Sequence, residues 1–202
     1  GIFRGAAPRG NGVTGEDVTE QARTIRSIPM RIDFRGVTEA KGECIMRRSA
    51  FRKYNETAEE PLKNPRNGAA GALRNLDPSV TAKRNLDMIF YDVNYISDDS
   101  VRSQEEGVEW LRKNRFKTEK LLVSRDIEEI ISAISAVDRD ALDFDIDGMV
   151  VKVDDYALRE KLGFTDKFPR WAIAYKFEAE ETTTKVKDVV WQVGRTGKLT
   201  PL

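Results

Sequence analysis

Two lysines lie within segments that are otherwise apolar, and they are the first residues here whose chemistry needs explaining. Lys152 follows the run MVV inside residues 143–155 (DFDIDGMVVKVDD), and Lys176 lies near the end of residues 169–177 (PRWAIAYKF). Both segments have the β-branched and apolar composition of buried strands. An ammonium group on such a strand needs an anion beside it, because a buried charge without a partner is costly.

The anion beside Lys152 is either part of the protein or a ligand. Side chains alternate along a strand, so Lys152 shares one face with Val150. An internal ion pair would use one of three nearby carboxylates, Asp145, Asp147 or Asp154. This stretch alone leaves the two alternatives equal, but Lys176 repeats the same anomaly and so favours a ligand site.

A glycine-dense loop and a strand glutamate supply two further candidates. The loop APRGNGVTGED centres on Arg9, and we expect the helix after it to begin with a capping box at residues 14–17 and to end before Pro29. Such a loop can hold a phosphate, although most loops of this kind are plain turns. Glu43 lies in a predicted strand at residues 36–46, where it either binds a ribose hydroxyl or is simply solvated.

Residues 64–74 (NPRNGAAGALR) predict a helix with asparagine as its N-cap and proline at its first position. The small residues that follow allow very close packing. Arg66 and Arg74 on the same helix indicate that something anionic approaches its backbone, and tight packing alone is the alternative explanation.

Together these side chains make the inventory of a nucleotide site. Lys152 and Lys176 supply ammonium groups, Arg9 a guanidinium group and Glu43 a carboxylate. Asp147 is available for a divalent cation. Cationic groups of this kind neutralise the charge that develops on a transferred phosphoryl group. The sequence therefore predicts phosphoryl or nucleotidyl transfer.

The composition excludes other chemistries. The 202 residues are 40% hydrophobic, and 34 basic residues balance 34 acidic ones, so net charge gives no argument for nucleic acid. There is no histidine, and the single Cys44 excludes an internal disulfide or a cysteine zinc cluster within this chain. We expect a reducing, cytoplasmic location. No apolar run is long enough to span a membrane, and the first residues do not resemble a signal peptide.

The remaining segments predict a scaffold of interleaved helices and strands, which places the chain in the α+β class. Ser49 is expected to cap a short helix, and the stripe of isoleucines at residues 127–134 predicts a core-packed helix. Further strands are predicted at residues 86–96, 121–124 and 182–193, and further helices at residues 104–114 and 156–162, the latter closed by Gly163.

From its first residue to its last, the chain resembles the adenylation domain of bacterial NAD-dependent DNA ligases. The similar motifs, in the family's order, are APRGNGVTGEDVTEQARTI, KGECIM, NPRNGAAGALRNLDP, DGMVVKV, PRWAIAYKF and QVGRTGKLTP. The resemblance implies a nucleotidyltransferase domain of the DNA ligase and mRNA capping enzyme type at residues 1–179. Residues 180–202 would begin an OB-fold.

The resemblance also implies roles for individual residues. Glu43 would hold the adenosine ribose, and Lys152 and Lys176 the α-phosphate of NAD. Arg9 would contact the nucleotide phosphate and the nick, and Asp147 would contribute electrostatics linked to Mg²⁺. The residues expected to face DNA are Arg66, Arg74 and Arg195.

The family's nucleophile is a lysine in a Lys-x-Asp-Gly motif, and that motif does not occur in this chain. We therefore expect the chain alone to be inactive, while the intact enzyme would transfer AMP from NAD to itself and seal nicked double-stranded DNA in replication and repair. The alternatives are a catalytically inactive nucleotide- or nick-binding module and an ATP-dependent nucleotidyltransferase. The resemblance further implies a bacterial, nucleoid-associated monomer.

Overall fold

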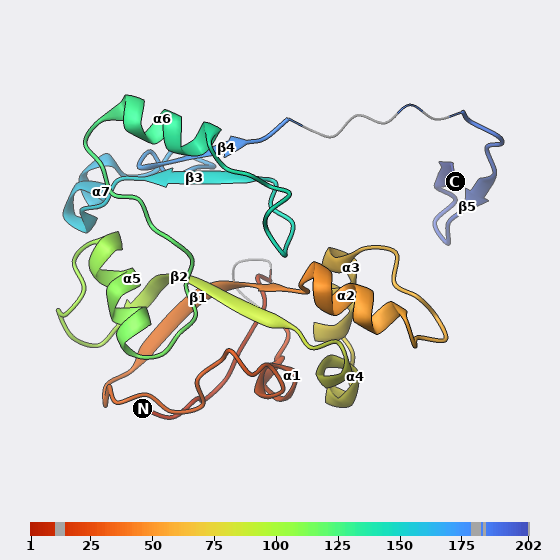
Figure 1. The fold of residues 1–202 in the computed structure, drawn as a ribbon, viewed down its shortest axis with the longest axis horizontal. Coiled ribbons are helices and arrows are strands. Elements are labelled where there is room, and N and C mark those ends of the chain that lie inside the picture. The colour runs from red at the N-terminus through yellow and green to blue at the C-terminus, as the bar shows by residue number, and fades with distance from the viewer. Residues whose placement is uncertain (11–14, 179–182, 184, 202) are drawn as a thin grey trace.

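The computed structural model of this chain describes residues 1–10, 15–178, 183 and 185–201 (Figure 1). Its helices are α1 (Thr19–Arg23), α2 (Arg48–Asn55), α3 (Pro65–Leu73), α4 (Pro78–Lys83), α5 (Gln104–Lys113), α6 (Ile127–Ser135) and α7 (Tyr156–Leu162). Its strands are β1 (Thr38–Ile45), β2 (Asp87–Ile96), β3 (Gly148–Lys152), β4 (Ala172–Lys176), β5 (Trp191–Val193) and β6 (Leu199–Pro201). The described strands form three antiparallel pairs, β1–β2, β3–β4 and β5–β6. Helices and strands are thus interleaved, as predicted for the α+β class, and the described strand pairs are antiparallel.

The β1–β2 pair carries the larger part of the core. The register places Lys41 opposite Asp92 and Glu43 opposite Ile89, with an irregularity between Lys41 and Gly42. A Cβ atom on Gly42 would lie 2.5 Å from the carbonyl oxygen of Ile89, so this strand position needs a glycine. Glu43 is the next residue along β1, and it is exposed.

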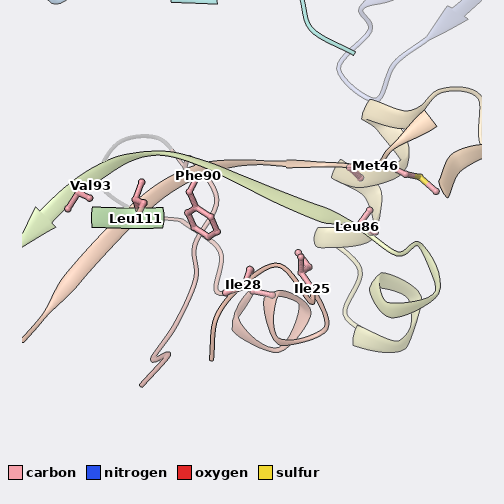
Figure 2. Packing of buried hydrophobic residues seen from close by; sticks show 10 residues of the cluster. Ile25, Ile28, Met46, Leu86, Phe90, Val93 and Leu111 are labelled. Atoms are coloured by element: carbon pink, nitrogen blue, oxygen red, sulfur yellow. The ribbon is translucent and has the colours of Figure 1, made fainter. Parts of the chain in front are cut away.

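Buried side chains from both strands and the surrounding helices meet beneath this sheet, as Figure 2 shows. Leu111 of α5 is fully buried, and α5 packs against β2. Phe90 meets Phe116 edge to face with their ring centroids 4.8 Å apart. The buried cluster consists of Ala22, Ile25, Ile28, Met46, Ala69, Ala72, Leu86, Phe90, Val93 and Leu111.

A buried carboxylate fixes the start of β2. Asp87 accepts hydrogen bonds from Arg47 at 2.7 Å and from Lys117 at 2.5 Å. Burial by itself would raise the pKa of Asp87, but the hydrogen bonds from Lys117, Ser27 and Arg47 outweigh it and hold this pKa below its usual value. The carboxylate is therefore ionised, and it ties the segments before α2 and after α5 to the first sheet.

The β3–β4 pair lies with α6 and α7 apart from the first sheet in the view of Figure 1. The register sets Gly148 opposite Lys176 and Lys152 opposite Ala172. A Cβ on Gly148 would overlap the carbonyl oxygen of Tyr175, which explains the glycine at the entry to β3. Gly163 has φ of 63° and closes α7, as predicted.

The prediction that α6 is packed into a core is wrong. The helix forms where expected, but none of its residues is buried, and the side chains of Ile127 and Ile131 are 60% and 49% exposed. The amphipathic stripe correctly indicates a helix. The described sheet beside it is only two strands wide, and so it offers too little surface to cover the stripe.

The cap of α2 also differs from the prediction. Ser49 is the second residue of the helix, and it donates to the distant carboxylate of Asp143, 2.9 Å from the backbone nitrogen and 2.5 Å from Oγ. The backbone N–H of Arg48 donates to the carbonyl oxygen of Asp143 at 2.7 Å. The hydrogen bonds from Ser49 lower the pKa of Asp143. Asp143 therefore accepts the hydrogen bonds at the start of α2, where Ser49 was expected to be the capping residue. These bonds join α2 to the segment before β3.

Three smaller expectations were partly or wholly wrong. Residues 121–124 pair with no strand in the part of the chain that the structure describes. Of the predicted strand at residues 182–193, only Trp191–Val193 is a strand, while residues 182 and 184 lie outside the described residues. Helix α1 ends at Arg23 instead of continuing to Pro29, and residue 14 of its predicted capping box also lies outside the described residues.

No described helix is long and apolar enough to cross a membrane.

Candidate active site

A large cleft brings together five of the residues singled out from the sequence. Its volume is about 3020 Å³, well above the roughly 300–1,000 Å³ of a typical small-ligand pocket. The loop before α1, strand β1, helix α3 and strand β3 contribute to its walls. The predicted site residues that line it are Arg9, Glu43, Arg66, Arg74 and Lys152.

Lys152 has an internal partner that sequence reasoning did not consider. Its Nζ lies 3.1 Å from Oδ2 of Asp92 on β2, and the two side chains are only 19% and 16% exposed. The ammonium group also lies 5.2 Å from the ring centroid of Tyr91. Lys152 is therefore held on the cleft wall by one carboxylate and one aromatic ring.

The three carboxylates proposed as internal partners of Lys152 are engaged elsewhere. Asp145 pairs with Arg48 at 2.8 Å, Asp147 lies 3.8 Å from Arg66, and Asp154 accepts the backbone N–H of Glu105. That part of the prediction was wrong because the real partner is 60 residues away on another strand. No local spacing rule could have identified it.

Tyr91 lines the cleft beside Lys152. Burial raises the pKa of Tyr91, the negative charges of Glu43 and Asp92 raise it further, and the positive charge of Arg9 lowers it. Arg9, Glu43, Tyr91 and Lys152 all line the same cleft.

Asp147 and Lys176 do not line the cleft. The Asp147 side chain is 74% exposed, and its ion pair with Arg66, itself 81% exposed, is of the weak surface kind. Lys176 is exposed at the end of β4 opposite Gly148. Residues opposite one another share a sheet face, so Lys176 faces the same way as Lys152 from the other end of the sheet. Arg195 is exposed in the turn between β5 and β6, away from the cleft lining.

The small residues of α3 divide into two groups. Gly68, Ala69 and Ala72 are buried, so packing explains them. Ala70 is exposed and lines the cleft. Gly71 is exposed, and a Cβ placed on it would meet nothing within 4 Å. The helix thus packs with one face and leaves an open face of very small side chains between Arg66 and Arg74.

Arg159 anchors the cleft wall and was not foreseen. This residue is 8% exposed, and its guanidinium group donates to the carbonyl oxygen of Val153 at 2.5 Å and to Oε1 of Gln104 at 2.9 Å. Its Cζ lies 4.6 Å from the ring centroids of both Tyr156 and Trp171. Gln104 in turn donates to the carbonyl oxygen of Tyr91. One hydrogen-bonded chain therefore runs from the carbonyl oxygen of Val153, the residue after Lys152, through Arg159 and Gln104 to the carbonyl oxygen of Tyr91.

Neither a cysteine nucleophile nor a protein-only metal centre emerges from the described residues. Burial, together with the charges of Glu43 and Asp87, raises the pKa of Cys44 to about 12, so its thiol is neutral near pH 7. Among the described residues, no group of three or more Asp, Glu or Cys side chains is placed to hold a metal ion. The Lys and Arg side chains that line the cleft can recognise anions.

Comparison with known proteins agrees with this chemistry. Residues 1–180 match the family model described as the NAD-dependent DNA ligase adenylation domain. A DNA ligase of Alkaliphilus metalliredigens is 52% identical over 199 residues, which are 97% of this chain. DNA ligase 2 of Clostridium acetobutylicum is 52% identical over 204 residues, and a DNA ligase of Clostridium botulinum 49% over 205 residues, each across the whole chain. The chain spans about 30% of the length of these relatives.

Proposed function

The chain belongs to the family of NAD-dependent DNA ligase adenylation domains, and from this premise we propose that its cleft binds the AMP portion of NAD during nucleotidyl transfer. The observation that carries the proposal is the gathering of Arg9, Glu43 and Lys152 on one cleft. Two of these side chains suit a phosphate, and the third suits a ribose hydroxyl.

We assign Glu43 to the adenosine ribose and Arg9 to the nucleotide phosphate and the nick. Lys152 and Lys176 are assigned to the α-phosphate. They share one face of the β3–β4 sheet, four residues apart along it, which is about 13 Å of strand. Long lysine side chains can converge on one phosphate from two such positions, and their charges would stabilise the transfer.

The transfer itself would proceed in three displacements in the intact enzyme. An amine attacks the α-phosphorus of NAD, and the bond to nicotinamide mononucleotide breaks. An oxygen of the 5′ phosphate of a nick then attacks the phosphorus of AMP, and the bond from AMP to the amine breaks. Finally the 3′ hydroxyl attacks the phosphorus of the 5′ phosphate, and AMP leaves as the strand is sealed. Lys152 and Lys176 would remain protonated to neutralise phosphate, so neither is assigned as the nucleophile.

We propose Mg²⁺ as a companion of the nucleotide phosphates, with Asp147 as an acidic side chain near its position. Mg²⁺ is usually held by one or two carboxylates together with phosphates. The described residues do not include a cluster of acidic side chains that could hold a metal ion without phosphate, and Asp147 lies 3.8 Å from Arg66. The nucleotide phosphates would therefore supply part of the Mg²⁺ coordination.

We propose the domain division at residues 1–179 and 180–202, with the second segment beginning an OB-fold. The family match ends at residue 180, and the β5–β6 pair forms its own two-stranded sheet, which supports this division. The partners of the intact protein would be NAD and nicked double-stranded DNA. We propose a monomer in the bacterial cytoplasm, associated with the nucleoid.

Nick sealing with alternative AMP donors tests the proposal. An intact enzyme that carries this chain should seal a nicked duplex with NAD and not with ATP at the same concentration. A DNA substrate without the 5′ phosphate serves as the control and should remain unsealed with either donor. Sealing with ATP alone would replace the proposal by an ATP-dependent nucleotidyltransferase. Binding of NAD or nicked DNA without sealing would leave an inactive binding module.

Arg66 and Arg74 should serve the DNA step. They are eight positions apart, which is about 2.2 turns of helix, so they flank one open face on which Ala70 and Gly71 allow a phosphate backbone to approach. Each alanine variant of the intact enzyme should still accept AMP from NAD but seal a pre-adenylated nick poorly. The salt dependence of nick binding should become shallower by about one unit of slope per contact.

Lys63→Ala provides the matched control, because Lys63 is an exposed basic residue outside the cleft lining. It should leave both the sealing rate and the salt slope unchanged. If the arginine variants kept the wild-type sealing rate and the wild-type salt dependence of nick binding, the role of α3 would be structural only. Equal loss of adenylation would place these arginines in the nucleotide pocket.

A further inference from the structure

The ammonium group on which the proposed function depends is already neutralised in this structure. Lys152 Nζ lies 3.1 Å from Asp92 Oδ2 in a pair of largely buried side chains. The two residues come from different sheets, β3 and β2. A nucleotide phosphate approaching Lys152 therefore meets a resident carboxylate that competes for the same positive charge.

Lys41 lies on β1, the strand paired with the one that carries Asp92, but it has a different partner. Lys41 lies opposite Asp92 in the β1–β2 register, but its ammonium group donates to Oδ1 of Asn94 at 2.7 Å. Asp92 forms its ion pair with Lys152 among the described residues. If Lys152 turned towards a phosphate, the carboxylate would need a replacement donor, because an unpaired charge that is mostly buried is costly.

A replacement donor is present. The hydroxyl of Tyr156 at the start of α7 is buried, and it makes no hydrogen bond of good geometry among the described residues. Burial raises the pKa of this tyrosine to about 12, and the charge of Asp92 and the proximity of its carboxylate as a hydrogen-bond acceptor add to the effect. A protonated O–H group therefore lies within reach of the Asp92 carboxylate. Buried hydroxyls are normally hydrogen-bonded, so this hydroxyl can complete a bond to Asp92 when Lys152 moves away.

We propose that Asp92 is a positioning residue and an exchangeable counter-ion for Lys152. In the empty cleft it holds the ammonium group on the wall. When a nucleotide binds, Lys152 moves to the phosphate, and the Tyr156 hydroxyl donates to the carboxylate that Lys152 has left. The inference rests on the proposed function, because it takes Lys152 to be the phosphate ligand.

The exchange makes nucleotide binding weaker than the bare cleft would allow. A phosphate must displace the charge-assisted hydrogen bond between Lys152 and Asp92 before it can bind Lys152. The same competition favours departure of a phosphate-bearing product. Removing the charge of Asp92 should therefore tighten the binding of a phosphate-bearing ligand and leave an uncharged analogue unaffected.

Calorimetric titration with AMP tests this directly, using an intact enzyme that carries this chain and has been freed of nucleotide. Asp92→Asn should bind AMP about 10-fold more tightly than the wild type, the scale of one charge-assisted hydrogen bond. Adenosine should bind both proteins equally. In a Lys152→Ala background, the further change Asp92→Asn should have less than a twofold effect on AMP, because the competition acts through Lys152.

Two variants complete the design. Asp99→Asn is the matched control, since it removes one exposed carboxylate from the loop after β2 and should change AMP binding less than twofold. Tyr156→Phe should weaken AMP binding several-fold, because Asp92 would lose its second donor. If Asp92→Asn lowers the melting temperature, Asp92→Ser repeats the test with a smaller uncharged side chain.

The outcomes separate this inference from the proposed function. If Lys152→Ala weakens AMP binding while both Asp92 variants bind AMP no more tightly than the wild type, the ion pair is a structural link and the exchange is refuted. If Tyr156→Phe equals the wild type, Tyr156 takes no part in it. If Lys152→Ala binds AMP as well as the wild type does, the assignment of Lys152 to phosphate fails, and the proposed site fails with it.

Discussion

Replacing Lys152 by alanine should reduce AMP transfer from NAD by about 100-fold or more in an intact enzyme, the scale expected when one preorganised electrostatic stabiliser is removed. Lys152 lies on the cleft wall with a side chain that is only 19% exposed. Its charge is poorly screened there and acts strongly on a phosphate. Lys176→Ala should have an effect of the same order, because both lysines are assigned to one phosphate. The measurement is single-turnover formation of the enzyme–AMP adduct.

Controls decide whether such a loss is electrostatic. Lys161→Ala removes an exposed lysine from α7 and should leave the rate unchanged. Lys152→Ala also leaves Asp92 without its partner, so the melting temperature must be measured beside the rate. Combining it with Asp92→Asn removes that unpaired charge, and the rate should stay low. If the Lys152→Ala and Lys176→Ala proteins were folded and fully active, the assignment of both lysines to the phosphate would be wrong.

Helices with local signals were predicted well from the sequence. Asn64 accepts the backbone N–H of Asn67 and caps α3, and Pro65 occupies its first position as expected. Strands β1 and β2 begin and end within two residues of their predicted bounds. These elements were predictable because capping residues and alternating apolar residues act within a few positions of the chain.

Contacts between distant segments were not predictable in the same way. The cap supplied to α2 by Asp143 bridges 94 positions, and the pair between Lys152 and Asp92 bridges 60. The sequence identified Lys152 as a charge that needs an anion, and it could not choose the anion. Asp92 looked like any polar residue on a half-exposed strand, since nothing in its neighbourhood marks it as the partner of Lys152.

Burial was the second quantity that the sequence could not supply. The isoleucine stripe of α6 has the period of a packed helix, yet a period states only which side chains share a face. Whether that face is covered depends on how wide the facing sheet is. The same reasoning applies to α3, where one group of small residues is buried and another is open. The pattern NGAAGA alone does not separate them.

Arg159 is the residue outside the predicted set whose loss should damage the fold most. It is 8% exposed, its guanidinium group joins Val153 to Gln104, and it packs against two aromatic rings. Arg159→Ala would leave two acceptors without their donor and a void between the rings. We expect local stability of β3 and α7 to fall by about 3 kcal/mol, which combines an unsatisfied charge-assisted hydrogen bond with lost packing.

Hydrogen–deuterium exchange of the intact enzyme measures this local stability without requiring two-state unfolding. Amides of β3 and α7 should exchange about 100-fold faster in Arg159→Ala than in the wild type, since each factor of 10 corresponds to about 1.4 kcal/mol. Arg159→Lys should recover only part of the protection, because an ammonium group cannot reproduce the planar, two-partner contact between the rings. Arg170→Ala, an exposed arginine close by, should exchange as the wild type does.

The same variant should also affect the cleft, because Val153 follows Lys152 directly and Gln104 holds the backbone of Tyr91. AMP transfer should therefore fall in Arg159→Ala although Arg159 does not line the cleft. Faster exchange with an unchanged transfer rate would show that the anchor stabilises the fold without positioning Lys152. Exchange equal to that of Arg170→Ala would show that the buried guanidinium group is not an anchor at all.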